Sequence, residues 1–223
     1  FFDAIDLYKY SYAKAKDPNT KGYINYQVAI CYQNISEFRQ AELWFRKVTR
    51  RNPYSPLAYL YLADALHANE KFDEALENYK KYIELQPTDP KGQIGFNSSS
   101  VAKEWTENPT RYKAIPMYYF NSRESDFSVA YAKDNYKSVL YTSARKGVTG
   151  GKENPVTGQN YTDIFTSTID RKGEWSKPKP IEGEINTDYD EGACCTNAKA
   201  NMMWFTSVRP NEKGVLTTQI YVA

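Results

Sequence analysis

A repeat of 34 residues in the first half of the chain constrains its fold more than any other sequence feature. The apolar residues of a unit follow helical spacing, as at Leu62 and Leu66 and then at Phe72 and Leu76. The first half is therefore predicted to be a stack of helical hairpins, each covering a face of its neighbour. Eight pairs of positions match at the single offset: Val28 and Leu62, Ala29 and Ala63, Tyr32 and Leu66, Phe38 and Phe72, Ala41 and Ala75, Phe45 and Tyr79, Pro53 and Pro87, and Pro56 and Pro90.

Local signals predict where these helices begin and turn. Ser55-Pro56 and Asp89-Pro90 each combine an N-cap residue with proline at the first helical position. QNISEF and HANEKF are predicted to be the turns inside two hairpins. Four small residues are expected where paired helices approach closely: Ala29, Ala41, Ala63 and Ala75.

This spacing of small, aromatic and terminal proline positions resembles the tetratricopeptide repeat (TPR). Residues 22–55 and 56–89 are predicted to be two TPR units. Ala4 and Tyr8 suggest the second helix of an earlier unit, offset by three inserted residues around KDPNTKG. After Pro90 the pattern decays, which predicts a terminal capping helix from Ser98 to Thr106. The TPR helical domain, with its capping helix, is expected to span residues 1–107.

The resemblance to TPR proteins implies a binding scaffold whose first helices line a concave groove. Five residues are predicted to face this groove and contact protein partners: Tyr26, Gln33, Leu60, Asp64 and His67. The alternative is that each of them is an ordinary packing or solvated residue. The chain has a single histidine, and the sequence shows no second ligand or partner base for it. No catalytic residue, metal site or cofactor is therefore predicted.

From residue 108 the sequence changes to short aromatic-rich runs separated by turn-forming segments. The runs are IPMYYF, FSVAYA, SVLYTSA, DIFTSTI, MMWFTSV and TQIYVA, and the turns include KDN, RKGE and PNEKG. Short strands at this spacing predict an all-β sandwich, barrel or propeller over residues 108–223.

A second internal repeat narrows that choice. LYTSAR (residues 140–145) recurs as WFTSVR (residues 204–209), 64 residues later. Each copy is interpreted as the second, inner strand of a unit, with its apolar pair buried between units and its arginine bound to an acidic turn residue. TDIFTST and TQIYVA are predicted third strands, EWSKPKPI is a predicted fourth, and KGVTGGKENPVTGQNY is a predicted surface loop. The other matches pair Asn121-Ser122 with Asn186-Thr187, Asp126 with Asp190, and Arg145 with Arg209.

Four strands per repeating unit are typical of propeller blades. The succession N-[ST], Asp, [LW]-[YF]-T-S-x-R, D-I-F and W-S-x-P resembles the WD-like propeller repeats of bacterial envelope proteins, whose relatives include the TolB-type propellers. One blade and most of a second cannot close a ring. We therefore expect an α-then-β multidomain chain, a TPR solenoid followed by an incomplete propeller, that is a fragment of a longer protein.

TPR units followed directly by such a propeller resemble a family of Bacteroidetes outer-membrane-associated proteins with OmpA-like C-termini, which includes PorE-type components of the type IX secretion system. The resemblance is sharpest at YKAIPMYYFNSRESDFSVAYAKDNYKSVLYTSAR, after the last helix. It implies a periplasmic location at the outer membrane and protein partners in an envelope or secretion complex. It also implies peptidoglycan binding through an OmpA-like domain that this sequence does not contain.

Composition and motifs limit the other classes of function. The net charge of +2 indicates no nucleic-acid-binding surface, and no run has the length of a transmembrane segment. GxSxG and HExxH motifs are absent, and TIDRKGEW, which approximates a sialidase Asp-box, is interpreted as a turn between strands. A non-catalytic scaffold is expected. The alternative is a propeller-bearing envelope hydrolase whose catalytic residues lie outside this sequence.

The cysteines and several carboxylates are given structural interpretations. Cys31 is expected to be a buried thiol. Cys194 and Cys195 are expected to point to opposite faces of a strand, with a strained vicinal disulfide as the alternative. Three carboxylates are expected to bond turns and strand edges: Asp126, Asp163 and Asp190.

Overall fold

The computed structural model describes residues 1–50, 55–132 and 136–223 of the chain. They form two compact units, a helical unit (Phe1–Lys113) and a β unit (Ala114–Asn154 and Gly158–Ala223). Two sequence predictions, the repeat proline Pro53 and the turn at residues 133–135, lie outside the described residues.

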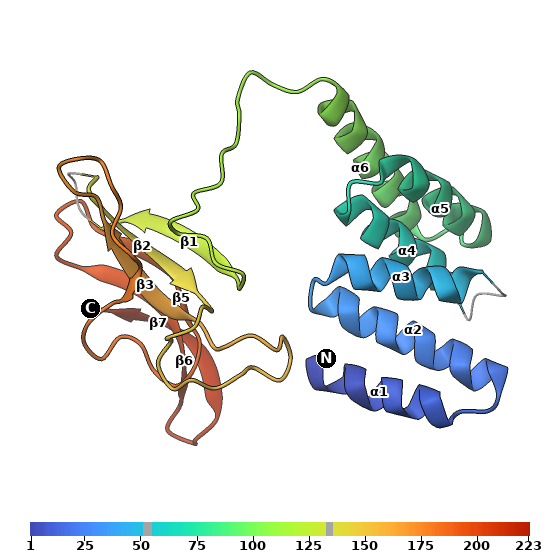
Figure 1. Ribbon diagram of the computed structural model, residues 1–223, viewed down its shortest axis with the longest axis horizontal. Helices are drawn as coiled ribbons and strands as arrows, with labels where there is room; N and C mark the ends of the chain where they lie inside the picture. Colours follow the sequence, from blue (N-terminus) through green and yellow to red (C-terminus); the bar gives the residue numbers. More distant parts are fainter. Residues whose placement is uncertain (51–54, 133–135) are drawn as a thin grey trace. The chain divides into compact units, whose positions relative to one another are not determined.

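The helical unit is a row of α-helices in which each helix packs against the next (Figure 1). Short connections join them into the hairpins α2–α3 and α4–α5 that the sequence predicts, and α1 supplies a helix before them. The helices are α1 (Phe2–Lys14), α2 (Pro18–Asn34), α3 (Phe38–Thr49), α4 (Leu57–Ala68), α5 (Phe72–Leu85) and α6 (Pro90–Glu107).

Aspartate N-caps precede two of the helices, α2 and α6. Asp17 before α2 and Asp89 before α6 each accept a hydrogen bond from a backbone N–H of the first turn, and proline follows each of them. Ser55 has a weaker contact before α4, where its hydroxyl accepts from the Leu57 N–H at 3.3 Å. The Asp17 cap refines one prediction. Helix α2 begins at Pro18, within KDPNTKG, whereas the first TPR unit was predicted to begin at residue 22.

The matched positions of the repeat form the core of this unit. The four alanines predicted at close helix contacts are fully buried, as is Phe45, while its repeat partner Tyr79 is 3% exposed. In the two hairpin turns, Ser36 and Glu70 both adopt a left-handed backbone with φ of 61°. The repeat therefore fixes turn geometry as well as packing.

Helix α6 corrects the predicted capping helix, because it begins at Pro90 rather than Ser98. Glycine lowers intrinsic helix propensity, which is why the sequence pattern was misleading here. The glycines instead allow close packing against α5, since a Cβ at Gly92 or at Gly95 would overlap a tyrosine ring of that helix.

Exposed polar residues lie along part of α6. Gln93 and Asn97 are exposed there, and the Gln93 amide donates to the Asn97 carbonyl oxygen at 2.8 Å. They share the exposed surface of the helix with Ile94 and Trp105.

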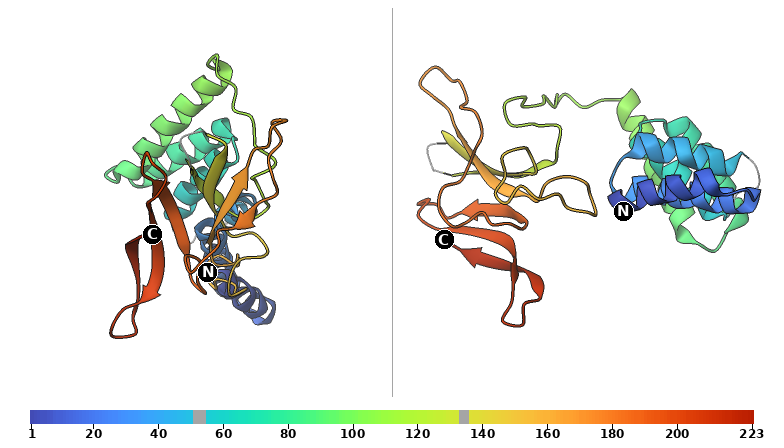
Figure 2. Two further views of the ribbon diagram at one scale, coloured as in Figure 1. Left: turned by 90° about the vertical axis from the view of Figure 1, so that its left-hand side faces the viewer. Right: turned by 60° about the horizontal axis from the view of Figure 1, so that its bottom comes forward.

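The β unit contains two antiparallel sheets that lie against each other as two layers (Figure 2). They do not form a closed ring within the described residues. The predicted run IPMYYF is not a strand, because it ends in a turn in which the Phe120 N–H donates to the Met117 carbonyl. The first sheet has the order β1 (Asp126–Tyr131), β2 (Ser138–Ser143), β3 (Asp163–Thr168), β4 (Lys179–Pro180), and the second β5 (Glu191–Thr196), β6 (Met203–Pro210), β7 (Leu216–Val222).

The two sheets share the same strand register. Asp126 lies opposite Ser143 in the first sheet, and Glu191 lies opposite Ser207 in the second. The residue equivalent to Asp126 is therefore Glu191, which corrects the predicted pairing with Asp190 by one position. Matched bulges follow in β1 and β5, where Ser128 and Ala193 have φ of 54° and 45°.

The cysteines of β5 confirm the prediction of opposite strand faces. Cys194 is buried between the two sheets, whereas Cys195 is exposed, and both are free thiols. Burial raises the pKa of the Cys194 thiol to about 11, so this thiol is unreactive at neutral pH. Cys31 is also a buried free thiol, as predicted.

Candidate functional site

The five predicted groove residues divide into two groups. Tyr26 and Leu60 are buried in the helical core, where the Tyr26 ring packs edge-on against Phe45 with 6.1 Å between centroids. They therefore offer little surface to a partner. Gln33, Asp64 and His67 are half-buried.

Two polar pairs join α4 to the helices beside it. The Asp64 carboxylate accepts from the Tyr79 hydroxyl of α5 at 2.6 Å. Nδ1 of His67 lies 2.8 Å from the Ser99 hydroxyl of α6. The structure thus gives two of the predicted residues, Asp64 and His67, polar partners on neighbouring helices.

Burial dominates the electrostatics of these pairs. It raises the pKa of Asp64, against the opposing effects of the Tyr79 hydroxyl and of His67. Burial and the neighbouring carboxylate also raise the pKa of Tyr79. Hydrogen-bonded polar groups at the contact of α4, α5 and α6 fix the helix register, because an unpaired member would carry the full cost of desolvation.

The Ser99 and His67 pair has the spacing of a nucleophile and its base, but not the access. Ser99 is 0% exposed, so its hydroxyl oxygen cannot reach a substrate. Ser99 and His67 instead bond each other at the contact of α4 and α6, and the Tyr79 hydroxyl bonds Asp64, so each of these groups has a structural partner.

Helix α6 supplies groove positions that the sequence interpretation missed. One repeat after Leu60 and His67 stand Ile94 and Val101, which are 62% and 42% exposed. Trp105 lies one helical turn further along α6 and is 71% exposed. The same 34-residue offset would have found Ile94 and Val101, had the helix been predicted to begin at Pro90.

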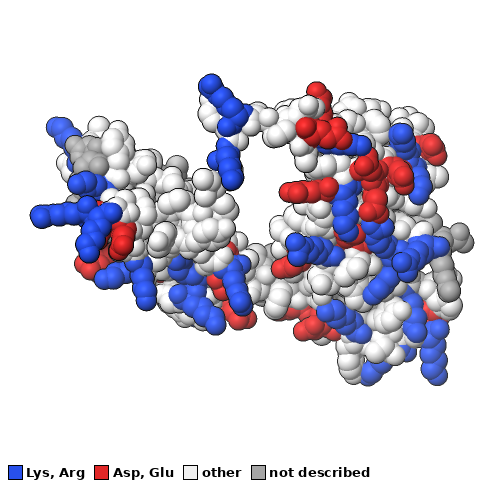
Figure 3. Space-filling model, turned by 45° about the horizontal axis from the view of Figure 1, so that its top comes forward, with Lys and Arg blue, Asp and Glu red and all other residues white. Residues whose placement is uncertain are grey.

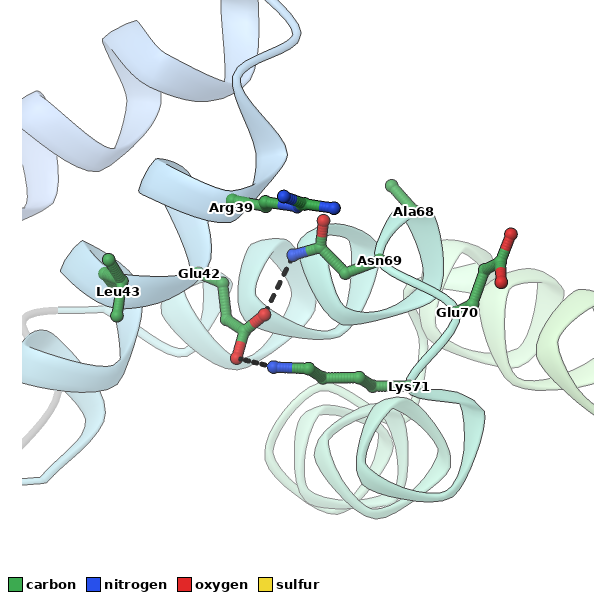
Figure 4. A pocket seen from close by; sticks show the side chains of 7 residues that line it. All are labelled: Arg39, Glu42, Leu43, Ala68, Asn69, Glu70 and Lys71. Carbon is green, nitrogen blue, oxygen red and sulfur yellow. Dashed lines mark hydrogen bonds and ion pairs between the residues drawn. The ribbon is translucent and has the colours of Figure 1, made fainter.

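A separate pocket of about 560 Å³ lies where the start of α3 meets the α4–α5 turn (Figure 4). Glu42, which is 5% exposed, accepts hydrogen bonds there from Lys71 at 2.7 Å, Asn69 at 2.8 Å and Arg46 at 2.9 Å. Burial acts to raise the pKa of Glu42, but these bonds outweigh it and hold the pKa below its usual range. The network ties one hairpin to the next, which is a structural role.

The recurring arginines of the β unit also have structural partners, at equivalent positions. The Nε atoms of Arg145 and Arg209 donate to the hydroxyls of Ser143 and Ser207, at 2.8 and 2.9 Å. Each Nη2 donates to a backbone carbonyl, of Phe120 or of Ile185. Both guanidinium groups also lie over aromatic rings, that of Arg209 4.5 Å from the Tyr221 centroid. They do not converge on one pocket.

The acidic partner predicted for the arginine is found in the first sheet. Arg145 forms an ion pair with Asp126 at 2.7 Å, and both side chains are largely buried. Burial acts to raise the pKa of Asp126, but hydrogen bonds from Ser143, Arg145 and Ser122 outweigh it and hold the pKa below its usual range. Glu191 accepts the equivalent bonds from Thr187 and Ser207 in the second sheet.

The other predicted carboxylates bond turns and strand edges. Asp163 accepts from the backbone and hydroxyl of Thr149, and Asp190 accepts from those of Thr162. In TIDRKGEW, the Asp170 carboxylate accepts from two backbone N–H groups of its own turn. This confirms the interpretation of that motif as a turn.

Surface charge and metal-ligand geometry were compared over the described residues. Over the helices drawn in Figure 3, acidic and basic side chains lie interspersed. Across residues 1–50, 55–132 and 136–223, no three His, Cys, Asp or Glu side chains are arranged to hold a metal ion. In the same residues, no helix combines the length and apolar character needed to span a bilayer.

Comparison with known families bears on the helical unit. The tetratricopeptide repeat model matches residues 56–89, the bounds of the second predicted unit. The protein contains a TPR. No curated protein matches the chain. The TPR match, together with the helical row, suggests a role of the helical unit in protein–protein interaction.

Proposed function

We propose that this protein is a non-catalytic scaffold that binds protein partners through the groove positions of its TPR helices. The observation that carries the proposal is that Ile94 and Val101 are exposed on α6. Their equivalents one repeat earlier are Leu60, which is buried, and His67, which is half-buried. Large apolar side chains that continue a groove on a rigid helix are typical anchors for a partner. Trp105 extends the same helix surface.

The polar pairs beside these positions support the proposal. Asp64 of α4 bonds Tyr79 of α5, and His67 of α4 bonds Ser99 of α6, which holds both neighbouring helices in register on α4. A preorganised surface loses less entropy on binding than a flexible one. The same bonds leave Ser99 buried, so this region favours binding over chemistry.

The resemblance of the sequence extends the proposal to location. An envelope protein with TPR units before propeller blades would act in the periplasm at the outer membrane, as a component of a type IX secretion complex of the PorE type. Contact with peptidoglycan would require a separate OmpA-like domain. The two sheets, with equivalent registers, bulges and arginine contacts, support an assignment as successive propeller blades.

A pull-down with matched variants tests the proposal. The tagged chain is compared with an Ile94→Arg/Val101→Arg variant and with Leu43→Arg, a control on the exposed part of α3. We expect one or more proteins to be retained by the wild type and the control and lost by the groove variant, while circular dichroism shows all three folded. Retention by all three would refute the groove. Partners that are exclusively cytosolic would refute the envelope location.

A further inference from the structure

Three turns lie next to one another at one end of the β unit. They are the hairpin between β1 and β2, the turn between β3 and β4, and the hairpin between β5 and β6 (Figure 1). The Ile169 N–H donates to the Lys137 carbonyl at 2.8 Å, and the Thr196 hydroxyl donates to the Tyr131 carbonyl at 3.1 Å. These bonds hold the turns together. We name residues 136–137, 169–177 and 197–202 the turn end of the β unit.

Basic residues outnumber acidic residues at the turn end. Its three segments contain five basic and two acidic residues. In Figure 3, Lys and Arg side chains gather at one end of the β unit. Four basic residues of the turn end are exposed and form no ion pair with the other described residues: Arg171, Lys172, Lys177 and Lys199. The turn end therefore presents several cations to solvent.

The acidic residues of the turn end are Asp170 and Glu174, and Asp170 has a structural role. Its carboxylate accepts from the backbone N–H groups of Lys172 and Glu174, at 2.8 and 2.9 Å. The Gly173 N–H closes the same turn by donating to the Asp170 carbonyl at 3.2 Å. Arg171 and Lys172 are therefore carried on a backbone that its own hydrogen bonds fix.

Carboxylates lie at the opposite ends of the strands. Asp126, Asp163 and Glu191 are the first residues of β1, β3 and β5, and hydroxyl groups donate to all three. The charge of the β unit is thus separated along its strands, which orients a protein toward an anionic partner. Sheets that pack face to face leave their strand ends uncovered. The exposure of the turn end is therefore independent of the number of sheets stacked beside these two.

We propose that the turn end of the β unit binds the surface of a membrane that contains anionic lipids. Its cations come from separate turns, so they suit an extended anionic surface better than a single peptide segment. Clusters of Lys and Arg are attracted to anionic headgroups, and each residue adds to the attraction. Tyr136, also at the turn end, is 66% exposed, and tyrosine rings are enriched at membrane–water interfaces. The proposal is independent of what the helical groove binds.

Co-sedimentation of the full chain with lipid vesicles tests the proposal. We expect binding to vesicles made of equal parts phosphatidylcholine and phosphatidylglycerol, and none to phosphatidylcholine alone. Raised salt should release the protein, because it screens exposed charges. Arg171→Ala/Lys172→Ala should weaken binding by about tenfold or more, because it removes two cations from the contact.

A matched pair of lysines at the other ends of the strands controls for net charge. Lys146 follows β2 and Lys213 lies between β6 and β7, and both are exposed. Lys146→Ala/Lys213→Ala removes the same charge as the turn-end variant and should bind vesicles as the wild type does. Circular dichroism checks that both variants are folded.

Several results would overturn the proposal. They are no binding to the vesicles that contain phosphatidylglycerol, equal binding to phosphatidylcholine alone, and an equal loss of binding in the control pair. A chain that binds no vesicles but retains an acidic protein through Arg171 and Lys172 would also overturn it, because the turn end would then bind a protein and not a lipid surface.

Discussion

The helical repeat and the β repeat can be compared at equivalent positions. In the helical unit the alanines between paired helices are buried in both copies, as Ala41 and Ala75 are, whereas Leu60 is buried and its equivalent Ile94 is 62% exposed. In the β unit, Ile164 and Ile220 occupy the same position, yet one is fully buried and the other is 75% exposed. A repeat therefore determines which contacts a residue can make, and the elements packed beside it decide whether it makes them.

Replacing each of the two equivalent isoleucines by aspartate should give the largest difference in the free energy of unfolding. Ile164→Asp should lower the free energy of unfolding by more than about 4 kcal/mol, because it buries an unpaired carboxylate. Ile220→Asp should lower it by less than about 0.5 kcal/mol in dilute solution, because the site is exposed. Urea unfolding measures the loss, and hydrogen exchange in β2 and β6 assigns it to the β unit. Equal losses in the two variants would remove the asymmetry.

The buried ion pair of the first sheet should give the next largest effect. Asp126→Asn removes the partner of the largely buried Arg145 and should cost about 3 kcal/mol at neutral pH. A depressed pKa means that the contribution of the carboxylate is present above its unfolded-state pKa of about 3.9. It is lost as pH falls through the lower folded-state pKa.

Acid titration separates this electrostatic contribution from simple loss of packing. Urea unfolding of the wild type should show falling stability below about pH 4, and the Asp126→Asn variant should show a shallower fall. Glu191→Gln is the matched variant in the second sheet, since Glu191 accepts the equivalent bonds from Thr187 and Ser207. An unchanged acid limb in Asp126→Asn would contradict the role given to the ion pair.

Two helical glycines should give the smallest effects, with opposite signs. Gly95→Ala should destabilise the helical unit by about 1 to 3 kcal/mol, because the added methyl overlaps the Tyr79 ring. Gly22→Ala lies inside α2, where an added Cβ meets nothing within 4 Å, and should stabilise by about 0.5 to 1 kcal/mol. Thermal unfolding followed by helical circular dichroism compares them. A stabilising Gly95→Ala would show that α6 does not depend on close approach.

Features that depend on local sequence patterns could be predicted from the sequence, whereas features that depend on packing or on strand register could not. The helical hairpins, their fully buried alanines and the second strands of both sheets followed from local periodicity. The start of α6 did not, because its glycines are tolerated only through packing on α5. The equivalence of Asp126 and Glu191 was missed because it depends on strand register. The burial of Tyr26 and Leu60, and the exposure of Ile94, depend on which helices lie beside them.

Site-specific photo-crosslinking from α6 tests the central claim, a partner-binding groove on the TPR helices, most directly. A photoreactive phenylalanine analogue replaces Val101 in one variant and Leu43 in the other, both exposed positions on the helical unit. After irradiation in native cells, we predict a discrete crosslinked protein for position 101 and none for position 43. The same crosslinked band from both positions, or one from position 43 alone, would contradict a binding groove at α6.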